Sequence, residues 1–127
     1  MLVSLPMKIV SAANKREHWS AKAKRVKAER AAVTPAVRSA LGVMAALRTA
    51  VGSPQRISCL PAVVTLTRIA PRPLDDDNNV SGMKAIRDGV ADALGIDDAD
   101  PRVTWRYAQA KGKPKEYALT IQIEERR

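Results

Sequence analysis

The sequence is short of aromatic residues, cysteine and histidine, and each shortage excludes a class of site. Only 3% of the 127 residues are aromatic and none is Phe, so a core must be built from Ala, Val, Leu, Ile and Met. The single cysteine, Cys59, excludes an internal disulfide and a zinc site built on cysteines, and we expect it to be buried and inert. The single histidine, His18, excludes metal chemistry that needs several histidines.

Long apolar runs are also missing. No run approaches the roughly 20 residues that a membrane-spanning helix needs. The opening residues are too short for the apolar region of a signal peptide and lack its basic leader, so we expect an intracellular protein. A chain of this length fits one domain, residues 1–127, and can bury a core without disulfides or a structural metal.

Acidic residues are scarce in the first part of the chain. Residues 1–74 contain 13 Lys and Arg but only two acids, Glu17 and Glu29, whereas residues 75–127 contain 9 basic and 11 acidic residues. The formal net charge is +9. A basic half of this kind is typical of proteins that bind a phosphate backbone, and the alternative is a well-solvated surface with no polyanion partner.

Hydrophobic patterning predicts a mixed α/β (α+β) fold, with helices packed on a small mixed β-sheet in the order β-α-(α)-β-α-β-β. Strands are expected at residues 2–9, 62–69, 102–110 and 116–123, with a hairpin loop at 111–115 between the last two. A helix is expected over 21–47 behind Ser20 as N-cap, divided at Pro35, with its second part packed inward. Another is expected from Ser81 to Leu94, ending at Gly95.

The acidic run Asp75, Asp76, Asp77, Asn78 and Asn79 is expected in a loop before this last helix. In an extended segment, Asp75 and Asp77 would lie on one side and Asp76 on the other. Two carboxylates on one side repel each other unless a cation lies between them, and Mg²⁺ binds one or two carboxylates in many proteins. Asp97 or Asp98 could supply a third ligand. The alternative is that these residues only cap turns around the helix start.

A calcium-binding EF-hand loop does not fit this run. Asp75, Asp77 and Asn79 match its first three alternate ligands. However, Val80 stands where the loop needs glycine, and Ile86 stands where it needs a bidentate glutamate.

Lys84 is the second candidate, because it lies off the apolar stripe formed by Met83, Ile86 and Val90. A lysine beside the aspartates can offset their charge, orient an attacking water or stabilise a phosphorane-like transition state. The alternative is an ordinary i,i+4 pair with Asp88.

Together these motifs resemble the RusA family, small phage- and prophage-associated Holliday junction resolvases (crossover junction endodeoxyribonucleases). The resemblance covers nearly the whole chain. It includes the opening strand and loop with Leu5, Pro6, Ala13, Asn14, Lys15 and Arg16, and the closing strands with Trp105 and Tyr117. Its most specific part is Asp75-x-Asp77-Asn78, Lys84, Ala85-x-x-Asp88-Gly-x-x-Asp92-Ala-Leu94 and Asp97-Asp98.

The resemblance implies a homodimeric endonuclease, dependent on Mg²⁺ with Mn²⁺ as a substitute ion, that cuts branched DNA in recombination and repair. It implies a bacterial cytoplasm and a phage or prophage origin. The three metal-binding aspartates of the family match Asp75, Asp77 and Asp98, with Asp97 as a rival, and its catalytic lysine matches Lys84. The interval between Asn78 and Lys84 is a few residues longer than in the best-known member of the family.

Several basic and polar residues are candidate DNA contacts, although for any single lysine a solvated face is the alternative. They are Asn14, Lys15, Arg16, Lys22, Lys24, Arg25, Lys27, Arg72, Lys111, Lys113 and Lys115. His18 and Trp19 can stack on a base or pack at a helix start, and residues 37–47 are a candidate dimer interface. The rival function is a non-catalytic DNA-binding phage accessory protein with a degenerate acidic loop.

Overall fold

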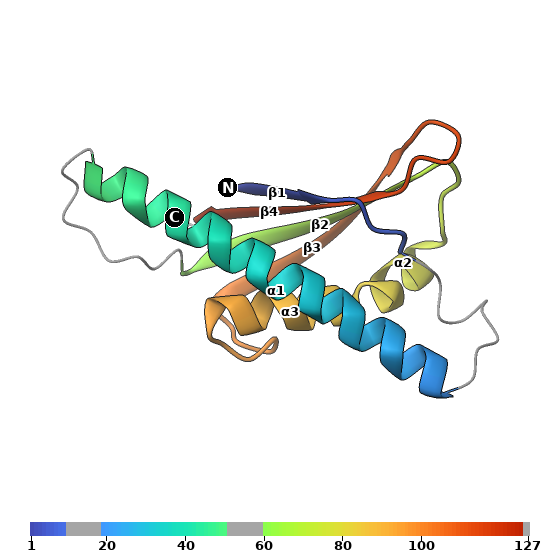
Figure 1. Ribbon diagram of the computed structural model, residues 1–127, viewed down its shortest axis with the longest axis horizontal. Coiled ribbons are helices and arrows are strands. Elements are labelled where there is room, and N and C mark those ends of the chain that lie inside the picture. The colour runs from blue at the N-terminus through green and yellow to red at the C-terminus, as the bar shows by residue number, and fades with distance from the viewer. Residues whose placement is uncertain (10–18, 51–59, 126–127) are drawn as a thin grey trace.

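The computed structural model describes residues 1–9, 19–50 and 60–125 (Figure 1). Along the chain the order is strand, helix, strand, two helices and two strands, as the mixed α+β prediction required. The elements are β1 (Leu2–Leu5), α1 (Trp19–Ala50), β2 (Ala62–Ala70), α2 (Asp76–Gly82), α3 (Lys84–Leu94), β3 (Val103–Lys111) and β4 (Ala118–Glu125). Asn14, Lys15, Arg16, His18 and Cys59 lie outside the described residues.

The four strands form one mixed sheet in the order β1-β4-β2-β3. The central strand β2 runs parallel to β3 and antiparallel to β4, and β1 pairs antiparallel with β4. A parallel pair needs a crossover connection, and α2 and α3 provide it between β2 and β3. Both parallel strands therefore end at the same edge of the sheet, close to where the acidic run begins.

The predicted hairpin at residues 111–115 is wrong. β3 and β4 are consecutive along the chain, but β2 lies between them in the sheet, so their connection crosses the end of β2. The alternating pattern of each strand marks which residues face the core. It does not say which strand is the neighbour, because this depends on tertiary packing.

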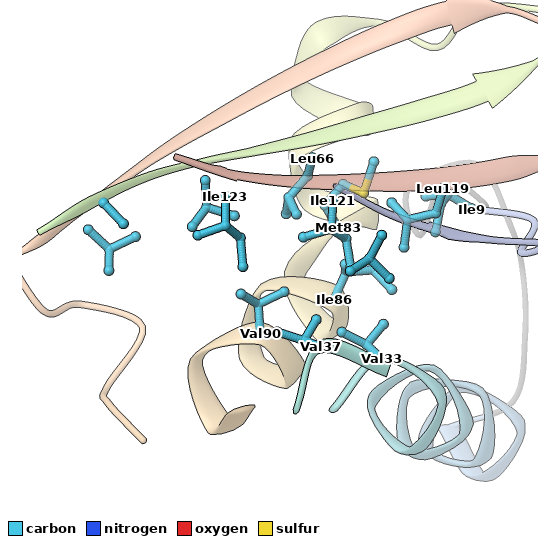
Figure 2. Packing of buried hydrophobic residues seen from close by; sticks show 14 residues of the cluster. Ile9, Val33, Val37, Leu66, Met83, Ile86, Val90, Leu119, Ile121 and Ile123 are labelled. Carbon is cyan, nitrogen blue, oxygen red and sulfur yellow. The ribbon is translucent and has the colours of Figure 1, made fainter. Parts of the chain in front are cut away.

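The core lies between the sheet and the helices α1 and α3, which cover the same face (Figures 1 and 2). Figure 2 shows Leu66 and Ile121 of the sheet above Met83 and Ile86. All four are fully buried, as are Val33, Val37 and Val90 of the two helices. The predicted apolar stripe of the helix at Lys84–Leu94 is therefore confirmed at Ile86 and Val90.

Helix α1 runs unbroken through Pro35, so the predicted division there is wrong. Pro35 is exposed, whereas Val33 and Val37 on either side of it are fully buried against the core. A proline inside a helix removes one hydrogen bond and costs about 3 kcal/mol. Packing of the two valines holds the helix together across this position, with the proline on the side where water can satisfy the freed carbonyl.

The end of α1 also differs from its prediction. Leu41 and Met44 pack partly against the core, but Val43 and Leu47 are 59% and 63% exposed. Apolar residues surround the helix here, and only one side of a straight helix can face the sheet. The expectation that this whole stretch packs inward is therefore wrong for Val43 and Leu47.

A close contact fixes the spacing of α1 and α3. A Cβ atom added at Gly89 would lie 3.1 Å from Cβ of Val33, and the Thr34 hydroxyl donates to the Gly89 carbonyl over 3.0 Å. A larger residue at this position would press on the Val33 side chain, so glycine suits this close packing. No helix among the described residues has the length and apolar character needed to cross a membrane.

Candidate functional site

A cleft of about 540 Å³ lies between the basic half of α1 and the start of α3. The end of α2, Asp98 and Tyr107 of β3 form the rest of its lining. Most of its polar lining is charged, with four basic and three acidic side chains: Lys22, Arg25, Lys84, Arg87, Glu29, Asp88 and Asp98. The fold thus brings Lys22, Arg25, Lys84 and Asp98, four of the residues singled out in the sequence, to one concave surface.

Lys84 is the first residue of α3 and joins two carboxylates. Its Nζ lies 2.8 Å from Oδ2 of Asp98 and 2.9 Å from Oδ1 of Asp88. The pair with Asp88 is the i,i+4 contact considered as the simpler alternative, whereas the pair with Asp98 spans fourteen residues of sequence. The pKa of Lys84 is raised, chiefly by its hydrogen bond to Asp98 and then by that to Asp88, so the ammonium group stays charged at neutral pH.

Asp98 is held on both its side chain and its backbone. Its carboxylate accepts a hydrogen bond from Lys84 and lies 3.2 Å from Nε of Arg87. Its carbonyl accepts hydrogen bonds from Arg87 (2.8 Å) and from the Trp105 indole (2.9 Å). Its pKa is lowered, first by the hydrogen bond from Lys84, although desolvation opposes this shift. Asp98 is thus an ionised and well-positioned carboxylate.

Asp97 is placed differently from its neighbour. Its Oδ1 accepts the backbone N–H of Ala99 over 2.9 Å, which is a local turn contact. It is exposed and does not line the cleft. Of the two rival aspartates, Asp98 is therefore the one that meets Lys84.

Arg87 is a member of this site that the sequence interpretation missed. Its guanidinium lies 4.8 Å from the centre of the Trp105 ring and donates to the Tyr107 hydroxyl over 3.1 Å. Its position three residues after Lys84, on the polar side of an amphipathic helix, was the available signal. What the sequence could not reveal is that the loop after α3 returns Asp98 to that same side.

The acidic run does not adopt the predicted extended loop. Asp75 is the N-cap of α2, and Asp76 and Asp77 form its first turn. Aspartates are favourable there because the helix dipole and the free N–H groups attract negative charge. Successive helical residues rotate by about 100°. The argument that Asp75 and Asp77 share one side of an extended chain is therefore wrong, although their role as ligands stays a prediction.

Ser81 is not the cap of a helix. Its hydroxyl donates to the Asn78 carbonyl over 3.3 Å within the last turn of α2, and the N-cap of α3 is Met83. The sequence predicted one helix here, and the structure has two short ones joined at Met83. This break points the end of α2 into the cleft and leaves the three exposed aspartates at its other end.

The donor chemistry of the predicted ligands suits Mg²⁺, but their arrangement here does not form one site. Among residues 1–9, 19–50 and 60–125, no three Asp, Glu, His or Cys side chains gather closely enough to hold a metal ion. Asp98 also directs Oδ2 toward Lys84 and Arg87. Asp75, Asp77 and Asp98 therefore do not fit a single ion as they stand, and the metal stays a prediction.

The candidate DNA contacts fall into two groups. Lys22, Lys24 and Lys27 are exposed on α1, and Arg25, which also lines the cleft, lies 3.2 Å from the Glu29 carboxylate. Arg72, Lys111 and Lys113 are exposed around the ends of β2 and β3, away from the cleft. Trp19 is 76% exposed at the start of α1, so it does not pack into the core.

Comparison with known proteins finds no match for this chain: no protein-family model, no curated protein and no solved structure. The function is therefore inferred from the residues that the fold brings together.

Proposed function

We propose that the protein is a structure-selective endodeoxyribonuclease that hydrolyses phosphodiester bonds in branched DNA, such as four-way junctions. The observation that carries this proposal is the contact between Lys84 and Asp98 in a cleft whose opposite wall is the basic helix α1. The RusA-like order of aspartates and lysine in the sequence supports the same reaction. We further propose a bacterial cytoplasmic protein of phage or prophage origin.

In this proposal α1 binds the DNA backbone. Lys22, Lys24 and Lys27 are exposed on its first turns, and of these three Lys22 lines the cleft. Contacts to phosphate fix the position of the DNA without reading its sequence. The enzyme would therefore recognise the shape of a junction, and its affinity would fall steeply with salt.

Lys84 is the proposed catalytic cation. Its ammonium group is held by Asp98 and Asp88, and it can move onto a phosphate oxygen or orient the attacking water. A positioned positive charge of this kind stabilises the negative charge that develops on the phosphoryl oxygens. Asp98 then holds the lysine at the phosphodiester, and Arg87 and Trp105 hold Asp98.

Magnesium dependence belongs to the proposal because Asp75, Asp77 and Asp98 follow the RusA-like order in the sequence, although these three carboxylates do not form one ion site in this structure. Carboxylate oxygens are the protein ligands that Mg²⁺ prefers. Mn²⁺ is the expected substitute ion. A homodimer is also part of the proposal, because a two-fold pair of clefts would match the two strands cut at a symmetric junction.

The rival function is a non-catalytic DNA-binding phage accessory protein. One observation favours it: Asp98 already has two cationic partners, and the acidic run lies outside the cleft. In that case α1 would still bind DNA, but no reaction would follow.

A synthetic four-way junction and a linear duplex of the same sequence separate these functions. Each is incubated with the protein in Mg²⁺, in Mn²⁺ and in EDTA, with Lys84→Met as the control for contaminating nucleases. We expect symmetric cleavage of the junction alone, only with metal and only by the wild type. Tight junction binding without cleavage in any metal would refute the nuclease and leave the rival.

A further inference from the structure

The side-chain amide of Gln109 binds both backbone groups of Leu74, the residue directly before the acidic run. Oε1 of Gln109 accepts the Leu74 N–H over 2.8 Å, and Nε2 donates to the Leu74 carbonyl over 2.7 Å. This two-bond contact reproduces the pairing of neighbouring strands at a point where the chain has already left the sheet. It fixes the backbone from which Asp75 starts α2.

A buried arginine sets the orientation of that amide. Arg68 on β2 is the register partner of Gln109 on β3, and its guanidinium lies 3.4 Å from Oε1 of Gln109. It also donates to the carbonyls of Arg72 (2.8 Å) and Ile9 (3.2 Å). Since a guanidinium only donates, Oε1 must face Arg68, and Nε2 is left for the Leu74 carbonyl.

Arg68 occupies a position where the alternation of β2 would place an apolar residue. It is 7% exposed, and burial lowers its pKa. Within the described part of the chain its hydrogen bonds go to neutral oxygens, one of which, the Arg72 carbonyl, lies on the segment that leads to the acidic run. A buried charge is costly unless it is hydrogen-bonded. A residue this costly, directed at the approach to Asp75, points to a role beyond filling the core.

The other end of the run is tied to the same strand. Asn79 is 3% exposed, and its Nδ2 donates to the Ala108 carbonyl, next to Gln109, over 3.3 Å. The three aspartates lie between these two anchors, Leu74 and Asn79. Their side chains are exposed, but the backbone that carries them is held at both ends against β3.

From this geometry we infer that Gln109, oriented by Arg68, is a positioning residue that fixes the acidic run for the proposed cleavage reaction. The inference rests on the proposed function. It makes the position of the acidic run depend on two residues outside the motif, since Gln109 follows Asp77 by 32 residues and Arg68 precedes Asp75 by seven. Both side chains come from the carboxyl ends of the two parallel strands, where α/β sheets place their sites.

The test replaces Gln109 with leucine, which keeps the size of the side chain and removes its hydrogen bonds. The matched control is Gln122→Leu on β4, because Gln122 is exposed on the other face of the sheet. Single-turnover cleavage of a saturating four-way junction gives the rate, and binding in EDTA gives the dissociation constant. We expect Gln109→Leu to lower the rate about 10- to 100-fold with unchanged junction affinity, and the control to match the wild type.

Gln109→Glu is the second variant, for the case in which leucine impairs folding. A carboxylate can accept from Leu74 and Arg68 but cannot donate to the Leu74 carbonyl. We expect a cleavage rate between those of the wild type and Gln109→Leu. If Gln109 only supported folding, both variants would cleave at the wild-type rate once folded. Wild-type rates in both variants would overturn the inference.

Amide hydrogen exchange separates this inference from the proposed function. In Gln109→Leu, the Leu74 amide should exchange at least about tenfold faster than in the wild type and the Gln122→Leu control, because its acceptor is lost. If the wild type cuts no DNA but this exchange changes, the proposed function fails and the positioning contact stands. Unchanged exchange at Leu74 would refute the contact whatever the activity.

Discussion

The Lys84–Asp98 pair and the acidic run both concentrate charge, but among the described residues only the pair has its charge balanced by an ion pair. Asp98 has two cationic side chains on its carboxylate and two donors on its carbonyl. Asp75, Asp76 and Asp77 are exposed, and the contacts that hold them act on the backbone at Leu74 and through the side chain of Asn79. The carboxylate of Asp98 is therefore already paired, whereas the carboxylates of the acidic run are available to bind a cation from solution.

This difference suggests that the Lys84–Asp98 pair and the acidic run have separate roles. A charge held by several fixed partners is already oriented and needs little rearrangement when a substrate arrives. Exposed carboxylates on an anchored backbone can bind and release an ion without disturbing the core. If the two regions act together, loss of either should stop the reaction, but each loss should have a different effect on DNA binding.

The largest expected effect comes from the acidic run. Asp77→Asn should lower junction cleavage by about a thousandfold or more, because metal-assisted hydrolysis loses a ligand. Junction binding should persist or tighten, since a negative charge near the phosphates is removed. Cleavage assays in Mg²⁺, beside binding in EDTA, measure both. Cleavage at the wild-type rate would remove Asp77 from the site.

Lys84→Met is expected to have the next largest effect. It should lower the single-turnover rate by about 100- to 1,000-fold, because a positioned charge at the transition state is lost. Junction affinity should change by less than about tenfold, since Lys22, Lys24 and Lys27 remain. The control is Arg106→Met, which removes an exposed cation on the sheet face opposite the core and should cleave like the wild type. Equal losses in both variants would indicate a general loss of positive charge.

How much of this could be predicted from sequence depends on whether the signal is local. The stripe of Met83, Ile86 and Val90 predicted the buried face of α3 because helical spacing is local. Lys84 was placed off that stripe for the same reason. The alternation along β2 predicted its buried face but not its position between β3 and β4, because strand neighbours are chosen by packing.

The site shows the same limit. The contact between Lys84 and Asp98 depends on how the loop after Gly95 turns back toward α3. The backbone directly before Asp75 is held by Gln109. This residue is uncharged and distant in sequence, so neither charge nor spacing indicates that it belongs to the site. The helical state of Asp76 and Asp77 was missed because acidic residues suit both turns and first helical turns, and the sequence was interpreted as the former.

Arg87 tests whether Asp98 is held in advance. Arg87→Met removes two contacts to Asp98 and the one to Tyr107 while keeping much of the contact with the Trp105 ring. We expect a loss of about 1–3 kcal/mol in the free energy of unfolding and about a tenfold lower cleavage rate. Chemical denaturation and single-turnover assays measure these. A stable, fully active variant would show that Lys84 and Trp105 orient Asp98 without Arg87.

The smallest expected effect is the pH dependence of the pair. The folded protein lowers the pKa of Asp98 below its ordinary value of 3.8, chiefly through Lys84. The ionised form therefore stabilises the fold above about pH 4, and this contribution is lost as the pH falls through the folded pKa. Asp100, whose pKa Arg102 lowers to about 2, titrates in the same range, so the wild-type curve contains both carboxylates.

Lys84→Met isolates the contribution of Asp98 because it leaves Asp100 and Arg102 unchanged. NMR titration of the Asp98 carboxylate should give a higher pKa in this variant than in the wild type, while the pKa of Asp100 should not move. As the pH is lowered from 5 to 2, the melting temperature should accordingly fall less steeply for the variant than for the wild type. If the pKa of Asp98 stays low without Lys84, Arg87 and the donors on the Asp98 carbonyl hold the carboxylate, and the charge balance of the cleft does not depend on its lysine.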